Sequence, residues 1–180
     1  MPSKTRDNRL RFFGRVGGLK SEPRKGWVMK LKMKHPESVA DHSYRVALMG
    51  MVYSDSRGLD TEKVVKMALL HDLPEVIVGD SIPGERAPAK KRLLESAAMD
   101  EILSDVNPNL ARRYRAIWEE YEEQVSPEAR LVSQLDKVEM VFQASEYKKQ
   151  DPRREVGEFV RSARTRVDDP ELIKVIDSLS

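Results

Sequence analysis

Apolar residues recur along this chain every three or four positions, the spacing of one face of an α-helix. This spacing marks segments near residues 10–19, 38–53, 61–72, 89–106, 108–124, 127–148, 157–167 and 170–179. None of them has the two-residue alternation of a half-buried strand. The pattern therefore predicts an all-α protein, in which amphipathic helices pack around a shared core.

Several helix starts are marked by capping residues. Ser38 is a suitable N-cap, and Asp41 occupies the position that completes a capping box. Asp60 or Thr61 is expected to cap the next helix. Pro127 occupies the first turn of another helix, where its missing N–H costs nothing. These residues predict where the helices begin.

Other local features predict turns and side-chain directions. Residues 1–8 are expected to form a loose tail, and 22–27, which contains a proline and a glycine, a turn. Residues 81–88, with two prolines and a glycine, are expected to form a loop. In the segment 89–106 the apolar spacing is expected to direct three residues inward: Leu93, Ala97 and Ile102.

Composition limits the possible classes of protein. The 180 residues are 39% hydrophobic and 34% charged, which fits one globular domain with a sizeable core. The sequence has no run of eighteen apolar residues, so no membrane span is expected. The basic N-terminus lacks the apolar stretch of a signal peptide, so none is expected. The absence of cysteine excludes disulfides and thiolate metal sites, and fits a cytoplasmic location.

The net charge of +2 does not by itself argue for a nucleic-acid partner. Basic residues do gather in the first 25 positions, where only two acidic residues accompany them. No nucleic-acid readout motif supports such a function, and the same charge would attract small phosphate substrates. Nucleic-acid binding therefore remains an alternative hypothesis that no sequence motif supports.

The chemically informative residues are the few histidines and the acids beside them. His71 and Asp72 end an apolar helical run, and the chain has only three histidines. His42 lies on the apolar stripe of the preceding helix, so it is predicted to point inward. Asp136 lies beside the apolar stripe of the segment 127–148, where an unpaired carboxylate is uncommon.

Two imidazoles and two carboxylates can fill four positions around one octahedral cation. Co, Mn, Fe, Ni or Mg would suit such a site better than a closed tetrahedral zinc site, although Zn stays among the candidates. Glu75 and Asp80 exceed this ligand count and are candidates for proton handling and for holding the attacking water. The alternative is a metal-free cluster of buried ion pairs, which is costly to desolvate.

These residues resemble the H…HD…D signature of HD-domain metal-dependent phosphohydrolases, and within them the HD-domain 5′-deoxynucleotidases. The resemblance runs from about Pro23 to Tyr147. It rests on the motifs RKGW at 24–27, PESVADHSYR at 36–45, HDLPEVIVGD at 71–80, WEEYE at 118–122 and QLDKVE at 134–139, and on QASEY at 143–147.

The resemblance implies an all-α HD-type helical bundle that binds one divalent metal ion through His42, His71, Asp72 and Asp136. It further implies that Glu75 and Asp80 act in water activation and in leaving-group or sugar contacts. We expect a single domain over residues 1–180, with a core at about 23–150, a basic segment at 1–22 and C-terminal helices at 154–179.

The resemblance also implies how the substrate is bound. Arg24 is expected to contact the phosphate, and Trp27 beside it is a candidate wall against C2′ of the sugar. From the residues alone, Arg24 could equally be a solvated loop charge and Trp27 a core residue. Members of the family are commonly dimers, so a homodimer is expected.

The expected activity is hydrolysis of nucleoside 5′-monophosphates, with a preference for deoxynucleotides. One alternative is another HD phosphohydrolase with a different nucleotide substrate, although dinuclear members need further histidines and none follows His71. A second alternative is a non-enzymatic helical module that binds protein or nucleic acid. The intact set of candidate ligands and acids argues against the second alternative.

Overall fold

The computed structural model describes residues 4–180, and the side chains from residue 8 onward. Apart from loops and one isolated antiparallel bridge between Pro23 and Ser38, the regular structure in this range is helical, which confirms the all-α prediction. The elements are α1 (Lys4–Val16), η1 (Gly17–Lys20), α2 (Lys25–Leu31), α3 (Val39–Arg57), α4 (Thr61–Leu70), α5 (Glu75–Val78), α6 (Pro88–Leu103), α7 (Pro108–Glu123), α8 (Pro127–Gln150), α9 (Gly157–Arg164) and α10 (Pro170–Leu179).

The predicted caps form. The Ser38 hydroxyl accepts the backbone N–H of Asp41, and the Asp41 carboxylate accepts the N–H of Ser38, which completes the capping box of α3. Asp60 accepts the N–H of Lys63 at 3.0 Å and caps α4. Pro127 is the first residue of α8. Satisfying these otherwise free N–H groups fixes where the helices begin.

Two predictions near the N-terminus are wrong. Helix α1 already begins at Lys4, where a loose tail was expected, and α2 begins at Lys25 inside the expected turn. Trp27 explains α2, because its indole packs between Tyr147 and Phe159 of distant helices. This tertiary contact stabilises a seven-residue helix that its own sequence would not sustain.

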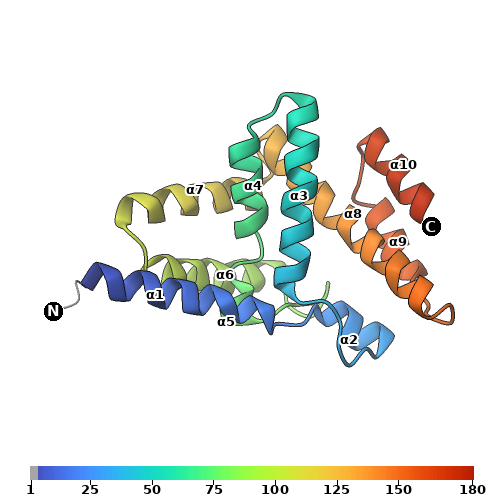
Figure 1. The fold of residues 1–180 in the computed structure, drawn as a ribbon, viewed down its shortest axis with the longest axis horizontal. Coiled ribbons are helices and arrows are strands. Elements are labelled where there is room, and N and C mark those ends of the chain that lie inside the picture. Colours follow the sequence, from blue (N-terminus) through green and yellow to red (C-terminus); the bar gives the residue numbers. More distant parts are fainter. Residues whose placement is uncertain (1–3) are drawn as a thin grey trace.

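The central core lies between α3, α4 and α8, with α9 and α10 packed on the outer side of α8 (Figure 1). Gly50 lets α3 and α4 approach closely, because a Cβ atom there would lie 2.8 Å from Cγ1 of Val64. Buried branched and aliphatic side chains fill this core, among them Val46, Met67, Leu135 and Ile176. The long helix α8 thus joins the middle of the bundle to its C-terminal part.

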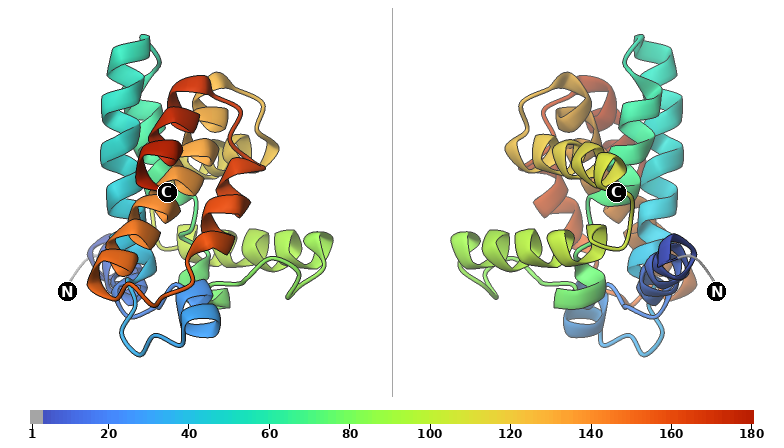
Figure 2. Two further views of the ribbon diagram at one scale, coloured as in Figure 1. Left: turned by 90° about the vertical axis from the view of Figure 1, so that its right-hand side faces the viewer. Right: turned by 90° about the vertical axis from the view of Figure 1, so that its left-hand side faces the viewer.

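A second core packs η1, α6 and α7 against the beginning of α3 and the end of α4. Only the C-terminal half of α6 takes part in it, and Figure 2 shows α6 projecting from the side of the molecule. Ile102 is buried as predicted, but the predictions for Leu93 and Ala97 are wrong: both are exposed, Leu93 by 70%. In this projecting half Leu93 and Leu94 stay exposed, although Arg92 pairs with Glu123 of α7.

No helix among the described residues combines the length and the apolar character needed to span a bilayer.

Candidate active site

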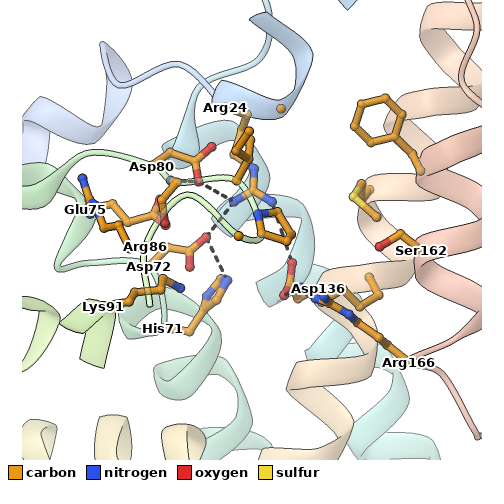
Figure 3. A pocket seen from close by; sticks show the side chains of 18 of the residues that line it. Arg24, His71, Asp72, Glu75, Asp80, Arg86, Lys91, Asp136, Ser162 and Arg166 are labelled. Atoms are coloured by element: carbon orange, nitrogen blue, oxygen red, sulfur yellow. Dashed lines mark hydrogen bonds and ion pairs between the residues drawn. The ribbon is translucent and has the colours of Figure 1, made fainter. Parts of the chain in front are cut away.

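One pocket of about 470 Å³ opens where these helices meet, and residues from both ends of the chain line it (Figure 3). Its floor holds the turn after α4, the start of α5 and the middle of α8. Residues of the loop 79–87, α6, α2 and α9 also line it. Arg24, His71, Asp72, Glu75, Asp80 and Asp136 all line this pocket.

His71 lies just beyond the last residue of α4, and a hydrogen bond at Nδ1 holds its ring in place. Its Nδ1 lies 2.7 Å from the carbonyl oxygen of Ala68, which can only accept a hydrogen bond, so Nδ1 carries the proton. Its Nε2 lies 3.2 Å from Oδ2 of Asp72. Trp118 donates its indole N–H to the carbonyl of His71 at 3.3 Å, which ties this turn to α7.

His42 enters the same space from α3 and is fully buried. Its Nδ1 contacts Oε2 of Glu139 at 2.5 Å. Its Nε2 lies 3.3 Å from Oδ1 of Asp136 and 3.7 Å from Oδ2 of Asp72. Burial and Arg24 lower the pKa of His42, but the carboxylates of Glu139 and Asp136 outweigh them and raise it to about 9.

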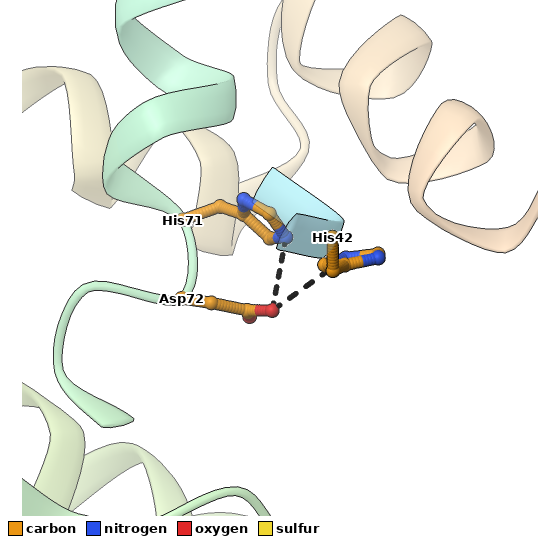
Figure 4. A group of neighbouring side chains, drawn as sticks. All are labelled: His42, His71 and Asp72. Atoms are coloured by element: carbon orange, nitrogen blue, oxygen red, sulfur yellow. Dashed lines mark ion pairs between the residues drawn. The ribbon is translucent and has the colours of Figure 1, made fainter. Parts of the chain in front are cut away.

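The two histidines and Asp72 have the donor chemistry of a metal centre. Their ligand atoms lie within 4.8 Å of one another, and the rings of His42 and His71 converge on the Asp72 carboxylate (Figure 4). Both Nε2 atoms are buried and have no hydrogen-bond partner in the part of the chain that the structure describes. A buried nitrogen without a partner is costly, and a divalent cation would relieve that cost.

Asp136 lies beside this group, on α8. Its Oδ1 faces Nε2 of His42, while Lys137 binds its Oδ2 at 2.6 Å. Burial opposes ionisation of Asp136, but Lys137 and the two histidines outweigh it and hold its pKa well below the usual value. The structure therefore brings together all four residues that the sequence predicted as ligands, with Asp136 shared between His42 and Lys137.

Arg24 is not a solvated loop charge. Its guanidinium lies in the pocket, 3.0 Å from Oδ2 of Asp72, 4.0 Å from Oδ1 of Asp80 and 3.8 Å from Oδ1 of Asp136. Arg24 is the N-cap residue of α2 and has an extended backbone. The position of α2 therefore decides where this guanidinium lies.

Glu75 begins α5 and is buried against the pocket, with no hydrogen-bond partner for its Oε2 among the described residues. Burial, reinforced by the carboxylates of Asp72 and Asp80, raises the pKa of Glu75 well above its ordinary value. A carboxyl group with a raised pKa in a pocket is a candidate for proton transfer.

Each oxygen of the Asp80 carboxylate accepts a hydrogen bond from a backbone N–H group. It accepts the N–H of Lys25 at 2.5 Å, at the start of α2, and the N–H of Ser81 at 2.8 Å. Gly79 before it has a φ of +73°, a backbone conformation that favours glycine. Asp80 thus connects the turn after α5 to the helix that positions Arg24.

Trp27 contributes to the pocket lining, but only 2% of its surface is accessible. Its ring centroid lies 4.1 Å from that of Phe159 and 5.3 Å from that of Tyr147. Its indole N–H donates to Oε1 of Glu37 at 2.8 Å. Most of its surface is therefore used for packing, which leaves little for a sugar to contact.

The sequence reasoning missed several residues of the site. Glu139 lies one turn beyond Asp136 on α8, and this spacing was an available signal because residues i and i+3 share a helix face. Arg86, in the loop 79–87, donates to the carbonyl of Val78 and leaves Nη1 buried without a partner among the described residues. Phe159 of α9 also lines the pocket, and its place there depends on tertiary packing that no local sequence pattern predicts.

Comparison with known proteins decides the family. A family model described as HD domain matches residues 16–176. This chain belongs to the HD-domain family. The matched residues begin at the end of α1 and run into α10.

Similar proteins include named enzymes and solved structures. 5′-deoxynucleotidase HDDC2 of Danio rerio is 41% identical over 177 residues, covering 97% of this chain and 87% of the relative. The solved PH0347 protein of Pyrococcus horikoshii is 30% identical and superposes with a TM-score of 0.78, covering 94% of this chain and 97% of that one.

A more distant structure shares the fold. The HD phosphohydrolase DatZ of cyanophage S-2L, solved with dA and one catalytic Zn²⁺ ion, is 23% identical, with a TM-score of 0.54 and coverage of 93% of this chain and 90% of that one. HD phosphohydrolases are metal-dependent, and this HD domain has a cluster able to hold a cation. The predictions of an HD-domain enzyme and of a divalent metal cofactor are therefore confirmed.

Proposed function

We propose that this HD domain hydrolyses 2′-deoxyribonucleoside 5′-monophosphates to nucleosides and inorganic phosphate. The observation that carries the proposal is the convergence of two buried Nε2 atoms, from His42 and His71, on Asp72 beside Arg24. The relatives named 5′-deoxynucleotidase, at up to 41% identity over most of the chain, support the choice of substrate.

In this proposal four residues hold the metal ion: His42, His71, Asp72 and Asp136. The bound ion would lower the pKa of water and offset the charge of the phosphoryl group. His42 would give up a proton when the ion binds, because the free residue has a pKa of about 9. Glu139 and the carbonyl of Ala68 hold the rear nitrogens of the two rings.

The remaining pocket residues bind the phosphate and move protons. Arg24 presents a planar fork of donors that matches two phosphate oxygens. Glu75 accepts the proton of the attacking water as the new O–P bond forms. The bond from phosphorus to the 5′ oxygen breaks, and that oxygen takes up a proton, for which Asp80 and Glu75 are the candidate donors because both line the pocket.

The deoxyribose preference needs a surface that gives a 2′-hydroxyl neither room nor a partner. An apolar wall alone rejects an added hydroxyl only weakly, by about 10²-fold. We assign this wall to Phe159 and to the small part of Trp27 that is accessible, since both residues line the pocket. Trp27→Phe and Trp27→Ala are expected to narrow the ratio of kcat/KM between dAMP and AMP.

Two further properties belong to the proposal. We expect the 180 residues to act as one HD domain that forms a homodimer, and the exposed apolar face of α3, with Tyr44, Leu48 and Val52, fits a surface for a second copy. A cytoplasmic location fits the absence of cysteine. Sedimentation of the wild type and of Val52→Glu tests the dimer.

The alternative of a nucleic-acid module has less support from the described residues. The basic segment at 1–22 is partly neutralised, because Arg11 pairs with Asp105 at 2.8 Å and Arg15 pairs with Glu101 at 2.6 Å. These pairs use the guanidinium groups that a nucleic-acid backbone would need. Salt-dependent binding of DNA or RNA by the purified protein would favour the alternative.

The deciding experiment is phosphate release by the protein loaded with Co²⁺, Mn²⁺ or Mg²⁺. The substrates are the deoxy- and ribonucleoside 5′-monophosphates, with deoxyribonucleoside 3′-monophosphates and cyclic nucleotides as controls. We expect release from deoxynucleoside 5′-monophosphates and little from the 3′ isomers. Equal kcat/KM for dAMP and AMP would overturn the sugar preference, and activity on cyclic nucleotides alone would favour another HD phosphohydrolase.

A further inference from the structure

Glu139 is buried behind His42 and is neither a metal ligand nor a proton-transfer group in the hydrolysis described above. It lies in the middle of α8, its side chain has no solvent exposure, and its Oε2 is 2.5 Å from Nδ1 of His42. The two residues are 97 positions apart in the sequence. A carboxylate without solvent contact is costly, so its retention in the core calls for an explanation.

Oε2 is an acceptor in the ionised carboxylate, so the contact requires the proton of the imidazole to be on Nδ1. The opposite ring nitrogen, Nε2, then faces Asp136 and Asp72 with its lone pair available once a cation binds. Glu139 therefore fixes both the tautomer and the orientation of the ring.

The second histidine of the cluster is held differently. Nδ1 of His71 contacts a neutral backbone carbonyl, that of Ala68, at 2.7 Å. His42 is the member of the pair whose rear partner is a carboxylate side chain. A carboxylate in this position raises the basicity of a metal-ligating imidazole, and losing such a partner commonly weakens metal binding by about 10–100-fold.

The other oxygen of Glu139 does not account for its burial. Oε1 has no hydrogen-bond partner within the described chain, and Nε of Arg45 lies 3.5 Å away. The guanidinium of Arg45 is instead hydrogen-bonded to Glu146 at 2.9 and 3.0 Å and to Gln143 at 3.0 Å. The close, well-formed contact of Glu139 is the one with His42.

We propose that Glu139 is a positioning residue of the metal centre: it holds His42 with Nε2 toward the cation and slows release of the bound ion. This inference rests on the proposed function only in taking His42 as a metal ligand. It assigns Glu139 no contact with substrate.

The test compares Glu139→Gln with the wild type and with Glu146→Gln. The glutamine keeps the size and one acceptor oxygen of Glu139 but removes its charge. Glu146 lies two turns further on α8 and binds the same Arg45, so Glu146→Gln disturbs Arg45 without touching His42. Each protein is loaded with Zn²⁺, and the transfer of the ion to an excess of a chromogenic chelator is followed.

We expect release of Zn²⁺ from Glu139→Gln to be about 10–100-fold faster than from the wild type, and release from Glu146→Gln to be unchanged. The release rate is the chosen readout because the proton on free His42 competes with uptake of the ion, not with its departure. Equal rates in all three folded proteins, or equal acceleration in both variants, would overturn the inference.

A second measurement needs no variant. The chain has three histidines, of which His35 is exposed and serves as a reference. In the Zn²⁺-loaded wild type, nitrogen-15 NMR is expected to show His42 protonated on Nδ1, with a strongly deshielded proton, and unprotonated on Nε2. A proton on Nε2, with Nδ1 bound to zinc, would overturn the inference even if Glu139→Gln does not fold.

These outcomes are independent of the substrate. A wild type that holds Zn²⁺ but hydrolyses no nucleoside monophosphate would contradict the proposed function and still allow the test of Glu139. An active wild type whose Zn²⁺ release is insensitive to Glu139→Gln would contradict only the role of Glu139.

Discussion

At the scale of single residues, Glu75 and its neighbours differ in what surrounds their carboxyl groups. Asp72 and Asp136 contact histidines and cations, which favour the ionised form. Glu75 is buried beside other carboxylates and has no such partner for Oε2 among the described residues. These surroundings suit Asp72 and Asp136 for cation binding and Glu75 for proton transfer.

Glu75→Gln should keep the metal and lose most of kcat, by about 10²–10⁴-fold, because an amide cannot accept the proton of the attacking water. The measurement is steady-state kinetics with metal content determined on the same samples. If the variant loses the ion, Glu75 is a ligand and the division of roles proposed here is wrong.

Arg24→Lys should keep the positive charge but lose the two-pronged geometry of the guanidinium. We expect a fall in kcat/KM of at least 10-fold for dAMP, with unchanged metal content, and a larger fall for Arg24→Ala. Arg92, which pairs with Glu123 away from the pocket lining, offers the control Arg92→Lys. Unchanged kinetics in both Arg24 variants would remove Arg24 from the substrate site.

At the scale of elements, Arg57 of α3 connects to α10 through two carboxylates, that of the N-cap Asp169 and that of Glu171. The carboxylate of Asp169 accepts the N–H groups of Glu171 and Leu172, and it binds Arg57 of α3 at 2.7 Å. Partial burial opposes ionisation of Asp169, but the hydrogen bonds from Arg57 and from the backbone outweigh it and lower its pKa. Ionised Asp169 therefore stabilises the docking of α10.

Asp169→Asn should keep the cap and lose the ion pair, at a cost of about 1 kcal/mol in the free energy of unfolding at pH 7. Because the folded pKa is lowered, this difference should be complete above the ordinary aspartate pKa of 3.8 and disappear as the pH falls through the folded value. Thermal unfolding between pH 3 and pH 7 measures it.

Asp168→Asn is the matched control for the neighbouring exposed carboxylate. It should change the unfolding temperature little at any pH, since surface substitutions typically stay within about 0.5 kcal/mol. A gap between wild type and Asp169→Asn that grows toward acid pH would contradict the assigned ion pair.

At the scale of the whole molecule, the metal centre connects helices that are distant in the sequence. His42 belongs to α3, His71 and Asp72 follow α4, and Asp136 belongs to α8. An ion held by these three parts would bind the folded chain and not the unfolded one, so it should stabilise the entire fold.

Adding Mn²⁺ at about 100 times its Kd should raise the free energy of unfolding by about 2.7 kcal/mol. For a chain of this size that corresponds to a rise in Tm of about 5–11 °C. Asp72→Ala should retain its helical circular dichroism and lose this rise. An equal rise in Tm for Asp72→Ala would show that the ion binds elsewhere.

The sequence by itself was enough to predict those helices whose apolar face is buried along most of the helix. The beginnings of α3, α4 and α8 could be predicted because capping is a local interaction between residues a few positions apart. The inward direction of His42 followed from the stripe around Val39 and Val46, which the structure confirms as buried.

Only the tertiary structure decided which residues face one another across the pocket. Helix α2 exists because Trp27 packs on Tyr147 and Phe159, and Leu93 of α6 stays exposed because its half of the helix projects from the side of the molecule. Glu139 reaches His42 across 97 positions of sequence. Periodicity reports which face of a helix is apolar, but not which distant helix meets that face, and the placement of the site depends on the latter.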